Sequence, residues 1–289
     1  MTTTCQSSNP AEAACDASLT PELIITGIPR SGTSYLCNLL HRMSNCVILN
    51  EPPEAITALT NAKSPRGLAT FLRDRRQDVR AGIPIPNKLV DGRITQDTAQ
   101  SNETQLYSPE PASADFVLGI KQTLAFVSRL PMLRQMLPHA RLVACVRDPL
   151  DTIASWKGSF PHLAMADVVR QPVGNPIDPW LTPAQRQELR SIAAILDPAP
   201  RRAAWWRYLA NLLLASRDDL ILIRYEDLVT HPRRALARIL QGWPAGEEID
   251  PIDPSPIRHR RHMLSSADHL AIRALCRAPA NALGLNPDA

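Results

Sequence analysis

The sequence lacks a strong excess of either charge, with 32 lysine and arginine residues against 28 aspartate and glutamate residues and a net charge of +4. This balance argues against a protein that coats a nucleic acid with a broadly basic surface, but it allows a local basic pocket for an anion. We therefore expect a small anionic ligand and no nucleic-acid partner.

Long hydrophobic runs are also missing, since none of the apolar runs approaches the roughly 20 residues that span a bilayer. The first 18 residues, "MTTTCQSSNPAEAACDAS", contain neither the basic region nor the apolar region of a secretory signal peptide. Hydrophobic residues nevertheless make up 44% of the chain, which is enough for a sizeable core. We predict a globular, cytoplasmic protein with no membrane partner.

Paired cysteines and metal-binding patterns are absent from the sequence. The six cysteines show no paired spacing, so we predict reduced, structural thiols. None of the seven histidines forms a metal-spaced pair with cysteines or carboxylates, so no metal is predicted.

Short apolar runs that predict strands alternate with helical patterns along the chain. The first strand, "LIIT", is followed by a helical pattern as far as Met43 and by a second strand, "CVILN", that ends at Asn50. Later runs, "FVLGI", "RLVACV" and "LILIRY", are again followed by helical patterns. The pattern predicts an α/β fold, a central parallel sheet with helices on both faces.

The domain prediction follows from the segments that do not fit this alternation. Residues 1–20, rich in Ser, Thr, Ala and Pro, are predicted to be a disordered tail. The remainder, 21–289, is predicted to be a single domain. Two stretches, 51–115 and 158–200, fit the core poorly, the second having one clear helix after Thr182–Pro183, and are predicted to be insertions over the site.

The stretch "TGIPRSGTSY", residues 26–35, lies where the first strand feeds a helix. Gly27 and Gly32 have the spacing of a phosphate-binding loop, GxxxxGK[ST], but Thr33 stands in place of the lysine and a cation appears earlier, at Arg30. Successive backbone N–H groups and the helix N-terminus still favour an anion. The predicted anion-binding residues are Pro29, Arg30, Ser31, Gly32, Thr33 and Ser34.

A second anion-binding element is predicted in "VACVRDPLDTIASW". Arg147 ends an apolar strand and Ser155 falls early in the following helix, so both can face one site at the carboxyl edge of the sheet. The basic cluster "IRHRRH", 257–262, is either a further phosphate contact or a solvated charge run.

These motifs together resemble the sulfotransferases that use 3'-phosphoadenosine 5'-phosphosulfate. "GIPRSGTS" resembles their 5'-phosphosulfate loop, "VRDPLDTIAS" their 3'-phosphate element, and "IRYEDLVTHPRRAL" the strand and helix that follow. The resemblance runs from about residue 23 to 240. It implies the P-loop-like sulfotransferase fold, a bacterial member of the family, this nucleotide as the sulfate donor, no required magnesium, and a hydroxyl acceptor that is a small molecule or a tyrosine peptide.

The resemblance also implies roles for residues outside the two phosphate elements. Lys121 resembles the lysine that contacts the bridging oxygen, and Arg30 would neutralise the sulfonyl oxygens. The cytosolic enzymes place a histidine two residues after that lysine, where this chain has Thr123. The tyrosylprotein and several bacterial members instead use a glutamate, which implies Glu51 as the base and Glu54 as the second choice, and an acceptor that is a peptidyl tyrosine, a carbohydrate or a specialised metabolite.

Two other functions are compatible with the sequence. In a P-loop kinase or nucleotidase, "LVACVRD" would be a degenerate strand that places Asp148 near magnesium. The chain could also be a nucleotide-binding module without catalysis.

Three aromatic residues of a strongly apolar helix, Trp205, Trp206 and Tyr208, are predicted to be core or pocket wall.

Overall fold

The computed structural model describes residues 21–60, 67–95, 103–246, 249–257 and 259–285. The predicted tail, 1–20, lies outside the described residues. No helix in the described ranges is long and apolar enough to cross a lipid bilayer.

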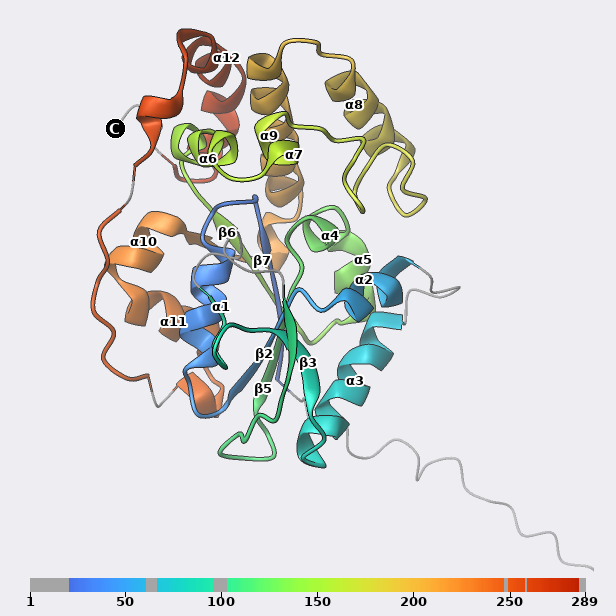
Figure 1. Cartoon of the computed structure of the whole chain (residues 1–289), viewed down its shortest axis with the longest axis vertical. Helices are drawn as coiled ribbons and strands as arrows, with labels where there is room; N and C mark the ends of the chain where they lie inside the picture. The colour runs from blue at the N-terminus through green and yellow to red at the C-terminus, as the bar shows by residue number, and fades with distance from the viewer. Residues whose placement is uncertain (1–20, 61–66, 96–102, 247–248, 258, 286–289) are drawn as a thin grey trace, which may run out of the picture.

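A five-stranded sheet in the order β2-β5-β1-β6-β7 forms the centre of the molecule, and every neighbouring pair is parallel (Figure 1). Its strands are β1 (Glu22–Gly27), β2 (Cys46–Asn50), β5 (Val117–Lys121), β6 (Arg141–Val146) and β7 (Leu220–Arg224). All five strands follow apolar runs, which suit a sheet that is buried on both faces. The predicted α/β class with a central parallel sheet is confirmed.

Helices cover both faces of this sheet, because successive side chains of a strand point to opposite sides. Leu23 and Ile25 of β1 pack with α1 (Thr33–His41) and α11 (Pro232–Leu240), whereas Ile24 packs in a second core. The helices of that second core are α2 (Pro53–Thr60), α3 (Gly67–Arg80), α4 (Thr123–Val127), α5 (Leu130–Met136), α6 (Pro149–Lys157), α7 (Pro161–Ala164), α8 (Pro183–Ala193), α9 (Pro198–Ala215) and α12 (Ser266–Ala282). Thus α1 after β1 lies on one face, and α4 after β5 and α6 after β6 lie on the other.

The start of α6 corrects one prediction about Ser155. Asp148 caps the helix, its carboxylate accepting hydrogen bonds from the backbone N–H groups of Leu150 and Asp151, and Pro149 occupies the first turn. Both features favour a helix start here. Ser155 therefore lies in the second half of α6 rather than early in it, although its side chain still reaches the site described below.

The segment 158–200 has more helix than the sequence pattern indicated. A capping box between Thr182 and Gln185 starts α8 where predicted, but α7 precedes it and α9 already begins at Pro198, behind its cap Asp197. The predicted core residues of α9, Trp205, Trp206 and Tyr208, are each no more than 2% exposed. They pack in the core and do not line the cavity.

The segment 51–115 contains α2, α3 and a hairpin of β3 (Ile85–Lys88) and β4 (Thr104–Tyr107). Asn87 is fully buried, donates to the carbonyl of Ile48 at 2.7 Å and accepts from the backbone N–H of Asn50 at 2.7 Å. These bonds fix the hairpin to strand β2, so the next residue, Lys88, is held at the carboxyl end of the sheet.

The remaining elements complete the carboxyl-terminal half. Asp268 of α12 binds Lys157 of α6 and Arg202 of α9, which ties the last helix to the body of the protein.

The four described cysteines, Cys37, Cys46, Cys145 and Cys276, are buried with free thiols, while Cys5 and Cys15 lie outside the described residues. The other short helices are α10 (Tyr225–Thr230) and the single turns Arg217–Asp219, Pro244–Gly246 and Arg261–Met263.

Candidate functional site

A cavity of about 910 Å³ opens at the carboxyl ends of the central strands, within the size range of small-molecule sites. Both segments predicted as insertions, 51–115 and 158–200, contribute to its walls. The predicted site residues that line it are Pro29, Arg30, Gly32, Thr33, Ser34, Glu51, Lys121, Arg147 and Ser155. Ser31 is fully buried and is not part of the cavity wall.

The loop after β1 brings its backbone close to Tyr225 at Gly32, the residue that begins α1. Gly32 has a φ of +90°, and a Cβ there would lie 2.6 Å from the ring of Tyr225, so no larger residue fits. Gly32 begins α1 without a side-chain cap. Because the first N–H groups of a helix have no partner within it, this end of α1 favours an anion in the cavity.

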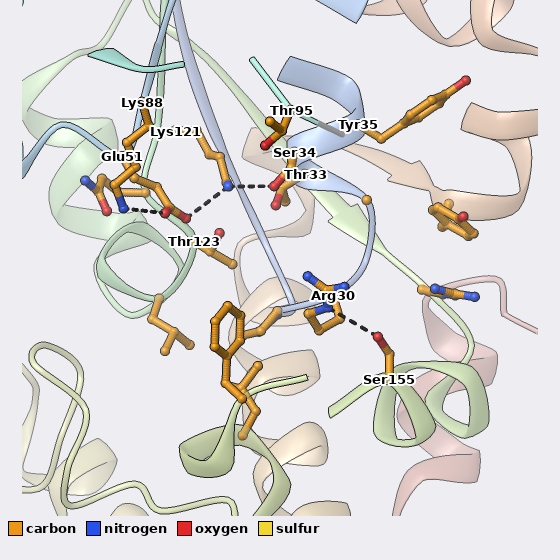
Figure 2. Close-up of a pocket in the computed structure, with 18 of the residues that line it drawn as sticks. Arg30, Thr33, Ser34, Tyr35, Glu51, Lys88, Thr95, Lys121, Thr123 and Ser155 are labelled. Atoms are coloured by element: carbon orange, nitrogen blue, oxygen red, sulfur yellow. Dashed lines mark hydrogen bonds and ion pairs between the residues drawn. The ribbon is translucent and has the colours of Figure 1, made fainter. Parts of the chain in front are cut away.

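Two arginines lie at the same end of the cavity. Arg30 donates from Nε to the hydroxyl of Ser155 at 3.2 Å, as Figure 2 shows, so the loop and α6 contact each other. The guanidinium of Arg147 lies 4.1 Å from the ring centre of Tyr225, in a cation–π contact. We call this end the basic end of the cavity.

The basic cluster at 257–262 lies beside the basic end. Arg260 lines the cavity, whereas His259 and Arg261 bind the Asp151 carboxylate at 2.8 and 3.3 Å. These contacts attach the segment to α6, and Arg258 lies outside the described residues.

Glu51, Lys121 and Ser34 form a chain of polar contacts across the middle of the cavity (Figure 2). The Nζ of Lys121 lies 2.9 Å from Oε1 of Glu51 and donates to the hydroxyl of Ser34 at 2.9 Å. The ammonium of Lys88 binds the other carboxylate oxygen of Glu51 at 3.2 Å. The structure thus brings Glu51 beside Lys121 and the loop, whereas Glu54 is exposed and does not line the cavity.

Strand register explains how residues so far apart in sequence meet here. Asn50, the last residue of β2, pairs with Lys121, the last residue of β5, and the N–H of Glu51 donates to the Lys121 carbonyl at 3.0 Å. Glu51 and Arg30 both have positive φ, 51° and 70°. Such non-glycine residues cost about 1–3 kcal/mol each and concentrate at functional sites.

The two lysines control the ionisation of Glu51. Burial raises the pKa of the Glu51 carboxyl, but the charges of Lys121 and Lys88 and their hydrogen bonds oppose it and lower the pKa to about 2. Since this pKa lies below the ordinary value of 4.5, Glu51 is a carboxylate at neutral pH. The pairs stabilise the fold above pH 4.5, and this contribution is lost as the pH falls towards 2.

Replacing Lys88 by methionine is expected to raise the pKa of Glu51, because one of its two cations is removed. The measurement is the carboxyl carbon resonance of Glu51, assigned from its absence in Glu51→Gln and followed against pH. Arg73→Met, which removes an exposed cation on α3, is the matched control and should leave the titration unchanged. A wild-type midpoint at the ordinary value of 4.5 would show that the pairs do not hold in solution.

Many residues of the cavity wall were not predicted from the sequence, among them Lys88, Tyr225 and Gln122. Lys88 ends the proline-rich stretch "GIPIPNK", Tyr225 starts a helix after β7, and Gln122 follows Lys121. Tyr225 lies within the segment "IRYEDLVTHPRRAL", but no role was predicted for it, and no motif marked Lys88 or Gln122. The available signal was a position at or shortly after the end of a predicted strand, which applied to Tyr225 and Gln122.

The structure gives Asp148 the role of a helix cap, and it does not line the cavity. Within the described ranges, no three histidine, cysteine, aspartate or glutamate side chains are grouped so that they could hold a metal ion.

The chain is similar to known sulfotransferases in sequence. The model of the family described as "Sulfotransferase family" matches residues 21–244. Among solved structures, the chain is similar to the crystal structure of sulfotransferase STF9 from Mycobacterium avium, with 12% sequence identity and a TM-score of 0.48 over 93% of this chain and 78% of that one. No curated protein matches it.

Proposed function

Because this chain belongs to the sulfotransferase family, we propose that it transfers the sulfuryl group of 3'-phosphoadenosine 5'-phosphosulfate to a hydroxyl group of an acceptor. One observation carries the proposal. A carboxylate, Glu51, lies 2.9 Å from the ammonium of Lys121, which reaches Ser34 at the N-terminus of α1, all in one cavity.

The basic end of the cavity suits the charged groups of this donor. The 5'-phosphosulfate would lie against the N-terminus of α1 and Arg30, where the loop backbone can approach closely. The 3'-phosphate would lie against Arg147 and Ser155. The ring of Tyr225 orients the Arg147 guanidinium, so less rotational freedom is lost when a phosphate binds.

Sulfuryl transfer needs a proton acceptor and stabilisation of the leaving phosphate, with the two reacting oxygens in line. The Glu51 carboxylate takes the proton of the acceptor hydroxyl as the new oxygen–sulfur bond forms. Lys121, between Glu51 and Ser34, meets the oxygen that stays with the departing phosphate. Arg30 neutralises the sulfonyl oxygens.

Lys121 links donor binding to the basicity of Glu51. A carboxylate with a pKa of about 2 is a weak base. When the Lys121 ammonium moves towards the anionic donor, its distance from the Glu51 carboxylate grows. Its lowering effect on the pKa of Glu51 is then smaller than in the free protein. Glu51 therefore becomes a stronger base when the donor is in place.

Arg147→Ala is expected to weaken donor binding by about 10- to 100-fold, because a partly desolvated charge-assisted hydrogen bond is among the stronger ones. Calorimetry with 3'-phosphoadenosine 5'-phosphate measures the loss. Adenosine 5'-phosphosulfate, which lacks the 3'-phosphate, should bind the wild type poorly and the variant equally poorly. Arg224→Ala, an exposed arginine at the end of β7, is the matched control. Equal affinity of the wild type for both nucleotides would remove Arg147 and Ser155 from the donor site.

A thermal-shift comparison separates the proposal from a P-loop kinase, which Thr33 in the lysine position and Asp148 in a helix cap both disfavour. A ligand that binds only the folded state raises its melting temperature. We expect 3'-phosphoadenosine 5'-phosphate to stabilise the protein in EDTA, and ATP with magnesium to have little effect. Stabilisation by ATP with magnesium alone would favour a kinase. A binding module without catalysis would bind the donor but form no sulfated product.

A further inference from the structure

A second part of the cavity lining differs from the basic end. Its walls come from α2, α4, α7 and the segment 171–173, and most of their side chains there are apolar. We call them the apolar wall. Its residues are Pro53, Ile56, Leu124, Ala125, Phe160, Leu163, Pro172 and Val173.

Chain connections place two helices of this wall, α2 and α4, next to the proposed reacting groups. Pro53 starts α2 two residues after Glu51, and Thr123 starts α4 two residues after Lys121. The acceptor hydroxyl that meets Glu51 therefore belongs to a molecule whose body lies against these helices.

The segment that carries Pro172 and Val173 is anchored firmly against α4 and α5. Asp178 binds the buried guanidinium of Arg129 and accepts a hydrogen bond from the N–H of Gly174 at 2.8 Å. The side chains of this ion pair are 0% and 5% exposed. A fixed segment gives the apolar wall a defined shape.

Beside the apolar wall, the cavity is lined by the polar residues Gln122, Thr123, His162 and Gln171. The amide nitrogens of Gln122 and Gln171 donate to the carbonyls of Pro52 and Asp167. The ring of His162 stacks on Phe160, with 5.4 Å between ring centres. Burial lowers the pKa of His162, and Asp167 only partly opposes this, so the ring is neutral at neutral pH.

The segment around the wall also exposes large apolar side chains. Met165, Val169 and Ile177 are 46%, 59% and 82% exposed, and they flank the wall residues Pro172 and Val173 in sequence.

We propose that the acceptor is a small alcohol or phenol whose body is apolar, such as an alkylphenol or a lipid-like alcohol. This inference rests on the proposed function and narrows its acceptor. A carbohydrate or a tyrosine peptide would bring many hydroxyl or amide groups against the apolar wall, and burying such groups without hydrogen-bond partners is costly. An apolar body instead gains from every methylene that it buries there.

A series of para-alkylphenols from methyl to octyl tests this directly, because their hydroxyl pKa values are nearly constant while their apolar area grows. With the sulfate donor saturating, kcat/KM is expected to rise by about three- to fourfold per methylene until the wall is filled. A tyrosine peptide and a phenyl glycoside serve as polar acceptors and should react more slowly than the octyl compound.

Two variants test whether the apolar wall causes the trend. Ile56→Asn and Leu124→Asn should each reduce the ratio of octylphenol to methylphenol kcat/KM by about tenfold, with donor affinity by calorimetry unchanged. Leu270→Asn, at a 68% exposed position on α12, is the matched control and should keep the wild-type ratio.

Equal kcat/KM values along the alkyl series would overturn the inference. A polar acceptor with a higher kcat/KM than octylphenol would overturn it as well. So would donor binding without sulfation of any alkylphenol. A protein that does not bind the donor contradicts the proposed function instead, and the separate calorimetric measurement distinguishes the two failures.

Discussion

Turnover of Glu51→Gln is expected to fall about 100-fold or more, while the affinity for the sulfate donor stays close to that of the wild type. Glutamine keeps the size and polarity of the side chain but cannot accept the proton of the acceptor hydroxyl. The carboxylate lies 2.9 Å from Lys121 in the cavity, where the acceptor would meet the donor in the proposed reaction. Steady-state kinetics with a para-alkylphenol measure the loss.

The acidity of the acceptor provides an internal control for this prediction. A phenol with a low pKa is already ionised and needs no base, so the loss in Glu51→Gln should shrink with such an acceptor. Glu54 lies three residues away at an exposed position of α2, so Glu54→Gln should reduce turnover only slightly. Wild-type turnover of Glu51→Gln with a high-pKa alcohol would exclude Glu51 as the base.

Lys121→Met is expected to lower turnover by about 100- to 1,000-fold, because it removes a cation from the position where charge develops on the leaving phosphate. The side chain is 1% exposed and binds Glu51, Ser34 and Asn50, so its charge acts in a partly dehydrated environment. Single-turnover kinetics with saturating donor separate this chemical effect from binding.

A low-pKa phenol should not rescue Lys121→Met, since the defect lies at the leaving group. This separates its role from that of Glu51. Because the substitution breaks a buried ion pair, the melting temperature and donor affinity of the variant must be measured beside its turnover. Rescue by acidic phenols equal to that of Glu51→Gln would show that Lys121 acts only through the carboxylate.

The sequence predicted the parallel sheet because all five strands are short apolar runs, which is the pattern of strands buried on both faces. Glu51 and Lys121 each follow one of these apolar runs directly, and parallel strands end at a common edge, so the sequence is consistent with the two residues lying near each other. The observed register, with Asn50 opposite Lys121, makes that proximity a direct contact.

Other parts of the site depend on tertiary contacts that no local pattern shows. Lys88 reaches Glu51 only because the buried Asn87 fixes a hairpin to β2. Ser155 reaches Arg30 from the second half of α6, since the cap at Asp148 starts that helix earlier than expected. The apolar wall combines residues of α2, α4, α7 and the segment 171–173, and the sequence pattern predicted neither α2 nor α7.

The transfer reaction itself is the most direct test of the proposed function. The protein is incubated in EDTA with 3'-phosphoadenosine 5'-phosphosulfate and a mixture of octylphenol, a tyrosine peptide and a sugar, and all products are quantified by mass spectrometry. We expect equal amounts of 3'-phosphoadenosine 5'-phosphate and sulfated acceptor, with little of either from Glu51→Gln. An unchanged donor and no sulfated product, together with consumption of ATP in a parallel reaction that contains magnesium and no EDTA, would contradict the proposed function.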